Sequence, residues 1–324
     1  MKARIERVAI VAGCCLALAL TANPAHAQFL GHNFRGDFGL QSASQPDPGW
    51  YLAALYLRYD ADTLLDRDGN SIGVDPERRG AVAANGYSVG IWGVTDIKIF
   101  GANYSFMLFP GWTDNKLEVP IIVLDQQIET GFTDLYLQPI NLGWHKKHAD
   151  FTAGLGVFAP TGSYEPGAED NLGLGMWSLE LFGGATVFFD KKKNWHFATT
   201  AYYEIHSEKK DTDIKVGDIL TLEGGLGKSF MQGALTVGAA YYAQWKITYD
   251  DLGQDLEQLL GVDELPRQRV FGVGPELTIP IATKKKLIGF LTARYLWETG
   301  ARSTLEGQTF VFQATFPIPS VKLQ

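Results

Sequence analysis

The amino-acid sequence predicts an all-β protein, a transmembrane antiparallel β-barrel of about twelve strands with periplasmic N- and C-termini. From Trp50 onward, segments of about ten residues alternate apolar side chains with small or polar ones, as strands do when one face meets lipid. The breaks between these segments alternate between short basic turns and long acidic loops. An N-terminal export signal precedes the whole pattern, so the chain is expected to leave the cytoplasm.

Residues 1–27 have the composition of a signal peptide that is removed. A basic start is followed by the apolar stretch 8–20 and by Ala25-His26-Ala27, which has the small-x-small form of a cleavage site. A lipoprotein signal is the alternative, because small residues precede Cys14. The apolar stretch before Cys14 is short for an export signal, and the stretch after it continues to the cleavage site, which favours simple export.

Composition excludes several classes of protein. After the signal, no stretch reaches the roughly 18 consecutive apolar residues of a membrane-spanning helix. The formal net charge of -8 disfavours nucleic acid as a partner, because an acidic surface repels phosphate backbones. Both cysteines, Cys14 and Cys15, lie within the signal, so no disulfide or thiol chemistry is expected in the exported chain. No nucleotide-binding or redox motif is found, and no cofactor is predicted.

The exported chain divides into three parts. Residues 28–49 lack the alternation of a strand and contain Pro46 and Pro48, so they are predicted to form a plug in the barrel mouth or a periplasmic lead-in. Residues 50–319 form the barrel, and residues 320–324 form a C-terminal tail.

The alternation of apolar side chains with small or polar ones predicts the position of each strand. In 235–247, Leu235, Val237, Tyr241 and Trp245 share the face expected to meet lipid, and in 51–59 the same division gives that face to Tyr51, Leu55, Leu57 and Tyr59. Twelve strands are predicted near 50–59, 84–94, 98–109, 131–142, 150–160, 176–189, 195–206, 218–230, 234–248, 269–281, 287–298 and 308–316.

The connections favour a membrane barrel over its soluble alternative. Short basic turns are predicted at 145–148, 190–194 and 283–286. Longer acidic loops are predicted at 60–83, 110–130, 161–174, 206–217, 249–268 and 299–307. In outer-membrane barrels the short turns lie in the periplasm and the long loops outside. A soluble exported β-sandwich would also show alternating strands, but it does not account for this asymmetry.

The residues opposite the lipid face are the candidate site, because they must point into the lumen. The charged members are Arg58, Asp134, Glu180, Glu204, Glu223, Lys246, Glu276, Arg294 and Glu298, and the aromatic members are Tyr56, Trp92, Phe158, Tyr202 and Tyr242. One interpretation is a polar, weakly cation-favouring pore whose aromatic rings guide a flat apolar solute. The other is that these side chains fill a narrow lumen and pair across it.

Catalytic and metal sites are not predicted. Glu204 and His206 share a strand face, but Ser207 points away from them, so a hydrolase cluster is not formed. His145 with His148, or His196 with His206, lack the dense set of ligands that a metal ion requires. The protein is therefore expected not to be an enzyme.

Several segments resemble a bacterial outer-membrane family associated with the MetA pathway of phenol degradation. The resemblance is carried by His32-Asn33-Phe34-Arg35-Gly36-Asp37-Phe38, Gln45-Pro46-Asp47-Pro48-Gly49-Trp50-Tyr51, Ala159-Pro160-Thr161-Gly162-Ser163-Tyr164, Asn171-Leu172-Gly173 and Trp177-Ser178. It extends over nearly the whole exported chain, and it implies an outer-membrane channel for uptake of aromatic or other hydrophobic compounds.

These observations together predict passive uptake of small hydrophobic or aromatic compounds across the outer membrane of a Gram-negative bacterium, in association with aromatic catabolism. The expected partners are outer-membrane lipid, lipopolysaccharide, the barrel-assembly machinery and the solute itself. The last strand, with Phe310, Phe312 and Phe316 on one face, resembles the closing strand that the assembly machinery recognises. The alternative is a closed structural or surface-interaction barrel without transport activity.

Overall fold

The computed structural model describes residues 29–72, 81–119, 124–168, 170–230, 235–283 and 287–318. The predicted signal peptide, the predicted tail 320–324 and the lysines of the predicted turn 283–286 lie outside the described residues. Within the described ranges, no helix is long and apolar enough to cross a membrane.

The regular secondary structure of the described residues is almost entirely β-strand, with one α-helix, α2 (Gly253–Leu260), and one 3-10 turn, η2 (Gly39–Gln41). The strands are β1 (Gly49–Leu64), β2 (Ala81–Ile99), β3 (Ala102–Phe109), β4 (Gly111–Val119), β5 (Leu124–Phe132), β6 (Leu135–His145), β7 (Ala149–Ala159), β8 (Ser178–Phe188), β9 (Trp195–His206), β10 (Ile219–Phe230), β11 (Leu235–Lys246), β12 (Arg269–Ala282), β13 (Leu287–Arg302) and β14 (Leu305–Ile318).

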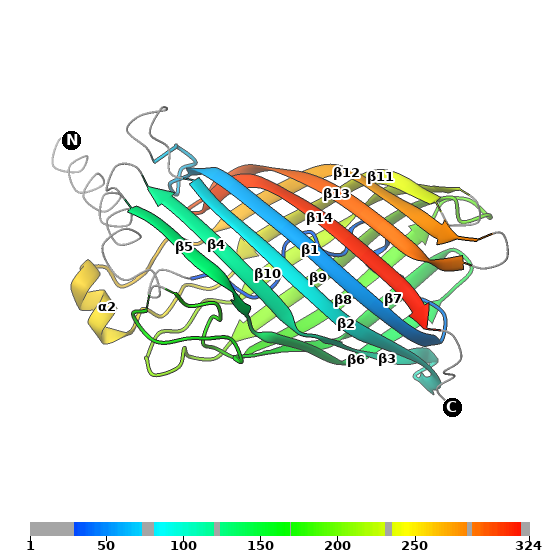
Figure 1. The fold of residues 1–324 in the computed structure, drawn as a ribbon, viewed down its shortest axis with the longest axis horizontal. Helices are drawn as coiled ribbons and strands as arrows, with labels where there is room; N and C mark the ends of the chain where they lie inside the picture. The colour runs from blue at the N-terminus through cyan, green and yellow to red at the C-terminus, as the bar shows by residue number, and fades with distance from the viewer. Residues whose placement is uncertain are drawn as a thin grey trace.

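The sheet closes on itself because β1 pairs with β14 on one side and with β2 on the other (Figure 1). β3 and β4 are two parts of one strand that is interrupted at Pro110, and both pair with β2. β5 and β6 are likewise two parts of the next strand, pairing with β4 and β3. The structure is therefore a closed antiparallel barrel of 12 strands, as the sequence predicts.

Two predicted long loops are instead largely strand. The range 110–130 is mostly β4 and β5, and the range 299–307 is mostly the ends of β13 and β14, joined at 303–304. In β4 the polar residues Thr113 and Asn115 alternate with the charged Asp114 and Lys116. Both faces of such a segment are polar, so the apolar alternation that marks a lipid-facing strand is missing although the backbone continues to pair.

The two faces of the barrel wall differ sharply. Along β9, every second residue from His196 to His206 is buried, while their neighbours Trp195 and Phe197 are exposed. Exposed apolar residues on neighbouring strands, including Leu181 and Leu226, lie on the same outer face. An apolar outer face and a buried polar inner face are what a barrel in lipid requires.

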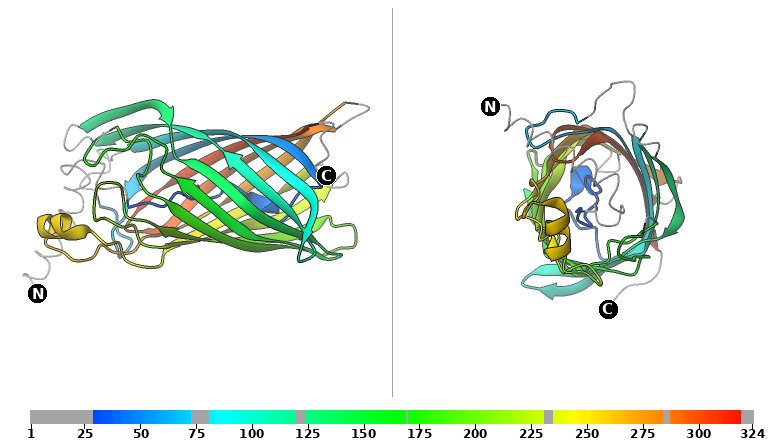
Figure 2. Two further views of the ribbon diagram at one scale, coloured as in Figure 1. Left: turned by 90° about the horizontal axis from the view of Figure 1, so that it is seen from below. Right: turned by 90° about the vertical axis from the view of Figure 1, so that its left-hand side faces the viewer.

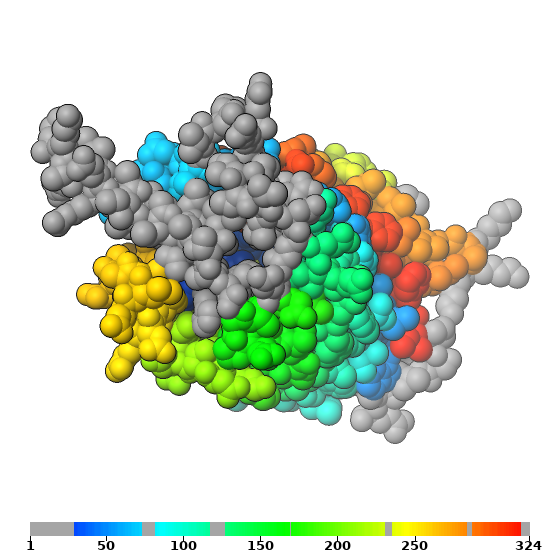
Figure 3. Space-filling model, turned by 60° about the vertical axis from the view of Figure 1, so that its left-hand side comes forward, coloured from blue at the N-terminus to red at the C-terminus, as the bar shows by residue number. Residues whose placement is uncertain are grey.

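The segment before β1 runs lengthwise inside the barrel (Figure 2). At one end, Phe29 packs in an apolar cluster with Val216, Leu252 and Leu256, next to α2. Figure 3 shows α2 in yellow at this end, with part of the segment visible in dark blue beside it. In mid-barrel the turn η2 contacts β9, β10 and β11, and Leu40 is fully buried. We call residues 29–48 the lumen segment.

The described chain begins and ends at opposite ends of the barrel. Phe29 lies at the end with the longer loops, whereas Ile318 pairs with Trp50 at the other end. The start of β1 and the end of β14 lie at the same end of the barrel, whereas Phe29 lies at the opposite end. An even number of antiparallel strands places the start of β1 and the end of β14 at the same end of the barrel. The lumen segment precedes β1 and runs from the opposite end through the barrel to that strand. Which end faces the periplasm stays a prediction.

Candidate functional site

The inner face of the barrel carries all but two of the predicted site residues. Those that point inward are Trp92, Asp134, Phe158, Glu180, Tyr202, Glu204, Glu223, Tyr242, Lys246, Glu276, Arg294 and Glu298. Direct cross-strand partners share a face, and the pairs Glu180 with Glu204, Glu223 with Tyr242 and Glu276 with Arg294 follow this rule around the barrel.

Tyr56 and Arg58 are the exceptions, because they lie on the outer face of β1. The Arg58 side chain is 42% exposed and pairs with Asp60 at 2.6 Å. On the opposite face, Leu57 is only 7% exposed, and the Tyr59 hydroxyl donates to Glu298 Oε2 at 2.9 Å. The prediction for β1 is therefore wrong by one residue of register. Leu55 and Leu57 face an apolar part of the lumen, so hydrophobicity on this strand does not distinguish lumen from lipid.

His32 is the residue of the lumen segment with the densest contacts. Its ring stacks on Phe158 with centroids 4.7 Å apart. Its Nε2 lies 2.8 Å from Asp134 Oδ2, and its Nδ1 lies 2.7 Å from Ser178 Oγ. Its backbone N–H donates to Glu204 Oε1 at 2.9 Å. Desolvation by burial lowers the pKa of His32 below its ordinary value, although Asp134 partly opposes this effect.

The next residue, Asn33, is held by two carboxylates from neighbouring strands. Its side-chain amide donates to Glu180 Oε2 at 2.9 Å, and its backbone N–H donates to Glu204 Oε1 at 3.2 Å. The Tyr136 hydroxyl donates to the other oxygen of Glu180 at 2.8 Å. Both carboxylates therefore accept hydrogen bonds from the lumen segment.

A second group of contacts surrounds Gly36. Its N–H donates to Glu223 Oε2 at 2.9 Å, and its carbonyl accepts from Arg294 Nη1. Arg35 forms an ion pair with Glu298 at 3.4 Å, and Tyr242 donates to the same carboxylate. The segment is thus tied to β10, β11 and β13 as well as to β8 and β9.

Asp37 is half-buried close to Glu223 and is not matched by a cation of its own. Burial and the neighbouring Glu223 carboxylate raise the pKa of Asp37 well above its ordinary value, while Arg294 acts in the opposite direction. Two carboxyl groups in one buried site cannot both ionise at low cost, so one of them tends to keep its proton.

Near η2, Glu276 accepts from the Leu40 N–H at 3.1 Å and from Arg294 Nε at 2.7 Å. Gly39 has φ +57, and a Cβ there would collide with Glu276 and Arg294. The position requires glycine both for its backbone conformation and for the close approach of the ion pair.

Lys246 fixes the first described residue of the segment. Its ammonium group donates to the Phe29 carbonyl at 2.8 Å and to both oxygens of Asp250, at 2.6 and 2.7 Å.

The predicted lumen charges are therefore engaged by the segment or by each other. The segment partners, His32, Asn33, Arg35 and Asp37, were outside the predicted site. The one available signal for them was a run rich in polar side chains, 32–37, in a part of the chain without strand alternation.

A cavity of about 430 Å³ remains between the lumen segment and the wall. This volume lies in the range of small-molecule sites, about 300–1,000 Å³. Its aromatic lining comes from both sides, with Phe34 and Phe38 from the segment and the rest from the strands. The strand residues include Trp92, Tyr136, Phe158, Phe182 and Tyr202. Polar residues of the lining include Glu180, Gln138 and Arg294.

A family model with the description "Putative MetA-pathway of phenol degradation" matches residues 62–314 of the sequence. Among curated proteins, none matches. The fold is similar to the crystal structure of the COG4313 outer membrane channel from Pseudomonas putida F1, with 12% identity and a TM-score of 0.66, over 89% of this chain and 100% of that chain.

Two further solved structures resemble the barrel more weakly. The β domain of the Bordetella autotransporter BrkA has 12% identity and a TM-score of 0.45, over 84% of this chain and 100% of that chain. The translocator domain of the autotransporter NalP from Neisseria meningitidis has 11% identity and a TM-score of 0.41, over 94% of this chain and 97% of that chain. The architecture is that of an outer-membrane β-barrel.

Proposed function

Because the chain belongs to the family described as "Putative MetA-pathway of phenol degradation", we propose that this outer-membrane barrel is a channel for passive uptake of small hydrophobic or aromatic compounds. The solute would move down its own concentration gradient, and no energy source is required.

The aromatic cavity beside the lumen segment is the observation that carries this proposal. Aromatic rings offer a flat apolar solute both buried area and stacking, and such contacts do not depend on one substituent pattern. Rings from the segment, such as Phe38, face rings from the wall, such as Tyr202, with centroids 5.7 Å apart. A solute that separates such a pair replaces one stacking contact by two.

The lumen segment acts in this proposal as a plug that selects against ions. It runs lengthwise inside the barrel, and the carboxylates Glu180, Glu204 and Glu223 are engaged by it. Carboxylates that already accept hydrogen bonds and are buried offer little to a passing hydrated cation. An apolar solute does not need those groups, so the plug disfavours ions more than it disfavours aromatic compounds.

Flux into intact cells tests the proposal. Cells lacking the gene should take up a phenolic or an alkylbenzene solute more slowly than complemented cells when the solute is at limiting concentration. Trp92→Ala removes a ring from the cavity and should slow complemented uptake, whereas Trp195→Ala removes an exposed ring from the outer face and should not. Equal uptake by deleted and complemented cells for every aromatic and apolar solute would sink the proposal.

The alternative is a closed barrel with a structural or surface-interaction role. The apolar cluster over the end of the lumen segment, with Phe29, Leu252 and Leu256, favours it because it covers the segment at the loop end. A closed barrel predicts no conductance in a planar bilayer, and phenotypes that follow deletion of the loops rather than changes in the lumen.

A further inference from the structure

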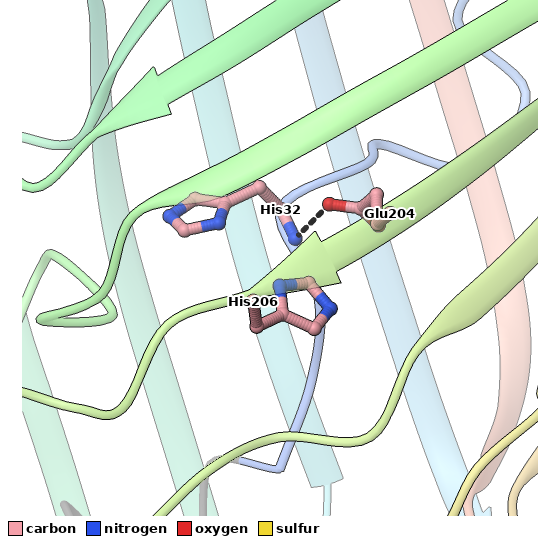
Figure 4. A group of neighbouring side chains, drawn as sticks. All are labelled: His32, Glu204 and His206. Carbon is pink, nitrogen blue, oxygen red and sulfur yellow. Dashed lines mark hydrogen bonds between the residues drawn. The ribbon is translucent and has the colours of Figure 1, made fainter.

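Three buried residues from two separate parts of the chain converge next to the start of the lumen segment. His32 comes from the segment, and Glu204 and His206 come from the inner face of β9 (Figure 4). One nitrogen or oxygen atom from each lies within 4.8 Å of the others. We propose that these residues bind one divalent transition-metal ion of the zinc type, which clamps the lumen segment to β9.

Two of the three residues carry a buried acceptor that no described residue satisfies. Glu204 is 1% exposed and His206 is 3% exposed. Glu204 Oε1 accepts from the segment, but Glu204 Oε2 and His206 Nε2 have no hydrogen-bond partner among the described residues. Buried lone pairs of this kind are costly when they face no donor or cation. A metal ion between them satisfies both.

The hydrogen bonds around the imidazoles leave each ring one nitrogen whose lone pair can bind a metal. His32 Nε2 is bonded to Asp134, which directs the lone pair of Nδ1 toward Ser178 Oγ. His206 Nδ1 lies 2.7 Å from the same hydroxyl oxygen, which leaves His206 Nε2 as its ligand atom. A carboxylate that holds the far nitrogen of a ligating histidine is the usual outer shell of such sites. On binding, His32 Nδ1 exchanges the Ser178 hydroxyl for the ion.

The ligand set determines the kind of ion. Two imidazole nitrogens and one carboxylate oxygen suit Zn²⁺ and other borderline transition metals, whereas Ca²⁺ and Mg²⁺ prefer oxygen ligands alone. Two atoms that each lie about 2.1 Å from one ion are at most about 4.2 Å apart. Small side-chain rotations therefore bring the group from its present spacing to bonding distance. The carboxylates of Glu204 and Asp134 offset the charge of the ion.

The position of the site gives the ion a mechanical role. His32 lies in the segment, and the other two ligands lie in the barrel wall. Metal binding therefore joins His32 to Glu204, which lies 172 residues later in the sequence. The free energy of binding then adds to the stability of the docked segment. This inference does not depend on the proposed solute, because metal binding is measured without transport.

The test is a titration of the purified, refolded barrel, without a polyhistidine tag, stripped with a chelator and dialysed against Zn²⁺ at known free concentrations. One tightly bound Zn²⁺ per chain is expected. His206→Ala and Glu204→Gln should each weaken binding at least tenfold, and Asp134→Asn should weaken it by about 10–100-fold. His196→Ala is the matched control, because His196 is another buried, inward-facing histidine of β9 outside the group, and it should bind like the parent.

Folding of each variant is checked by heat-modifiable mobility on a gel. If a β9 variant does not fold, His32→Ala takes its place, because His32 lies outside the strands. The X-ray absorption spectrum of the Zn²⁺-loaded parent should show scattering from imidazole ligands. Absence of a tightly bound Zn²⁺, binding by His32→Ala equal to the parent, or a spectrum without imidazole scattering would each overturn the proposal.

Discussion

Arg294 on β13 donates from Nε to Glu276 on β12 at 2.7 Å, and the same guanidinium group donates to the Gly36 carbonyl of the lumen segment. This buried ion pair therefore joins two barrel strands to a segment that lies 258 residues earlier than Arg294 in the sequence. The pair is 1% and 4% exposed at its two side chains, so water contributes little to its stabilisation. Four predictions follow from this packing of the segment against the wall.

Arg294→Met should destabilise the barrel by about 3–5 kcal/mol, because it leaves the Glu276 carboxylate buried without its cation. Denaturant unfolding of the refolded barrel, followed by tryptophan fluorescence, measures the loss. Arg58→Met is the matched control, since Arg58 forms an exposed pair with Asp60 on the outer face, worth about 0–1 kcal/mol. Equal losses for the two variants would contradict the role given to the buried pair.

Asp37 should make docking of the segment depend on pH. Because its pKa is raised in the folded protein, the folded state binds its proton more tightly than the unfolded state does. Its contribution is present at low pH and is lost as the pH rises from the ordinary value of about 3.9 toward the raised one. Segment release, seen as longer open times in a planar bilayer, should increase as the pH rises above that ordinary value.

Asp37→Asn should flatten this pH dependence, because an amide does not titrate. Glu223, Glu180 and Arg294 face the same site and stay in place in that variant. Asp47→Asn, at an exposed position of the same segment, should retain the pH dependence of the parent. A steep profile in Asp37→Asn would assign the effect to another group.

Removal of residues 29–48 should raise single-channel conductance several-fold, because the segment fills part of the lumen along its length and holds carboxylates of the inner face. The measurement compares the refolded parent and the deleted chain in the same bilayer. The heat-modifiable gel shift confirms that the deleted chain still forms a barrel. Indistinguishable conductance in two folded proteins would show that the segment does not limit the pore.

Gly39→Ala should loosen the segment more than Gly69→Ala loosens its loop. Both glycines have positive φ, +57 and +87, so an alanine costs about 1–2 kcal/mol of backbone strain at either position. At Gly39 the new methyl group also collides with Glu276 and Arg294, whereas at Gly69 the nearest atom is 3.8 Å away. Gly39→Ala should therefore lower the denaturant midpoint and change the conductance more than Gly69→Ala does. Equal behaviour of the two variants would contradict the close approach at Gly39.

The sequence alone predicted the barrel and its 12 strands, because the alternation of lipid-facing and inward side chains is written locally within each strand. Each predicted strand range overlaps a barrel strand of the structure. The prediction of strand faces and strand ranges failed where the two faces of a strand do not differ clearly in polarity. On β1, Leu57 faces an apolar cavity and Arg58 faces outward next to Asp60, and in β4 both faces are polar.

The candidate site was predicted only in part for a different reason. Inward orientation of Glu180, Glu204 and Glu223 follows from strand parity, but the partner of these carboxylates does not. That partner is a segment without a periodic pattern, whose contacts join His32 to Asp134 across 102 residues and to Glu204 across 172. Local periodicity contains no information about such pairs, because they depend on where the closed barrel places each inner face. The sequence therefore determined the wall, and the tertiary structure decided what the wall encloses.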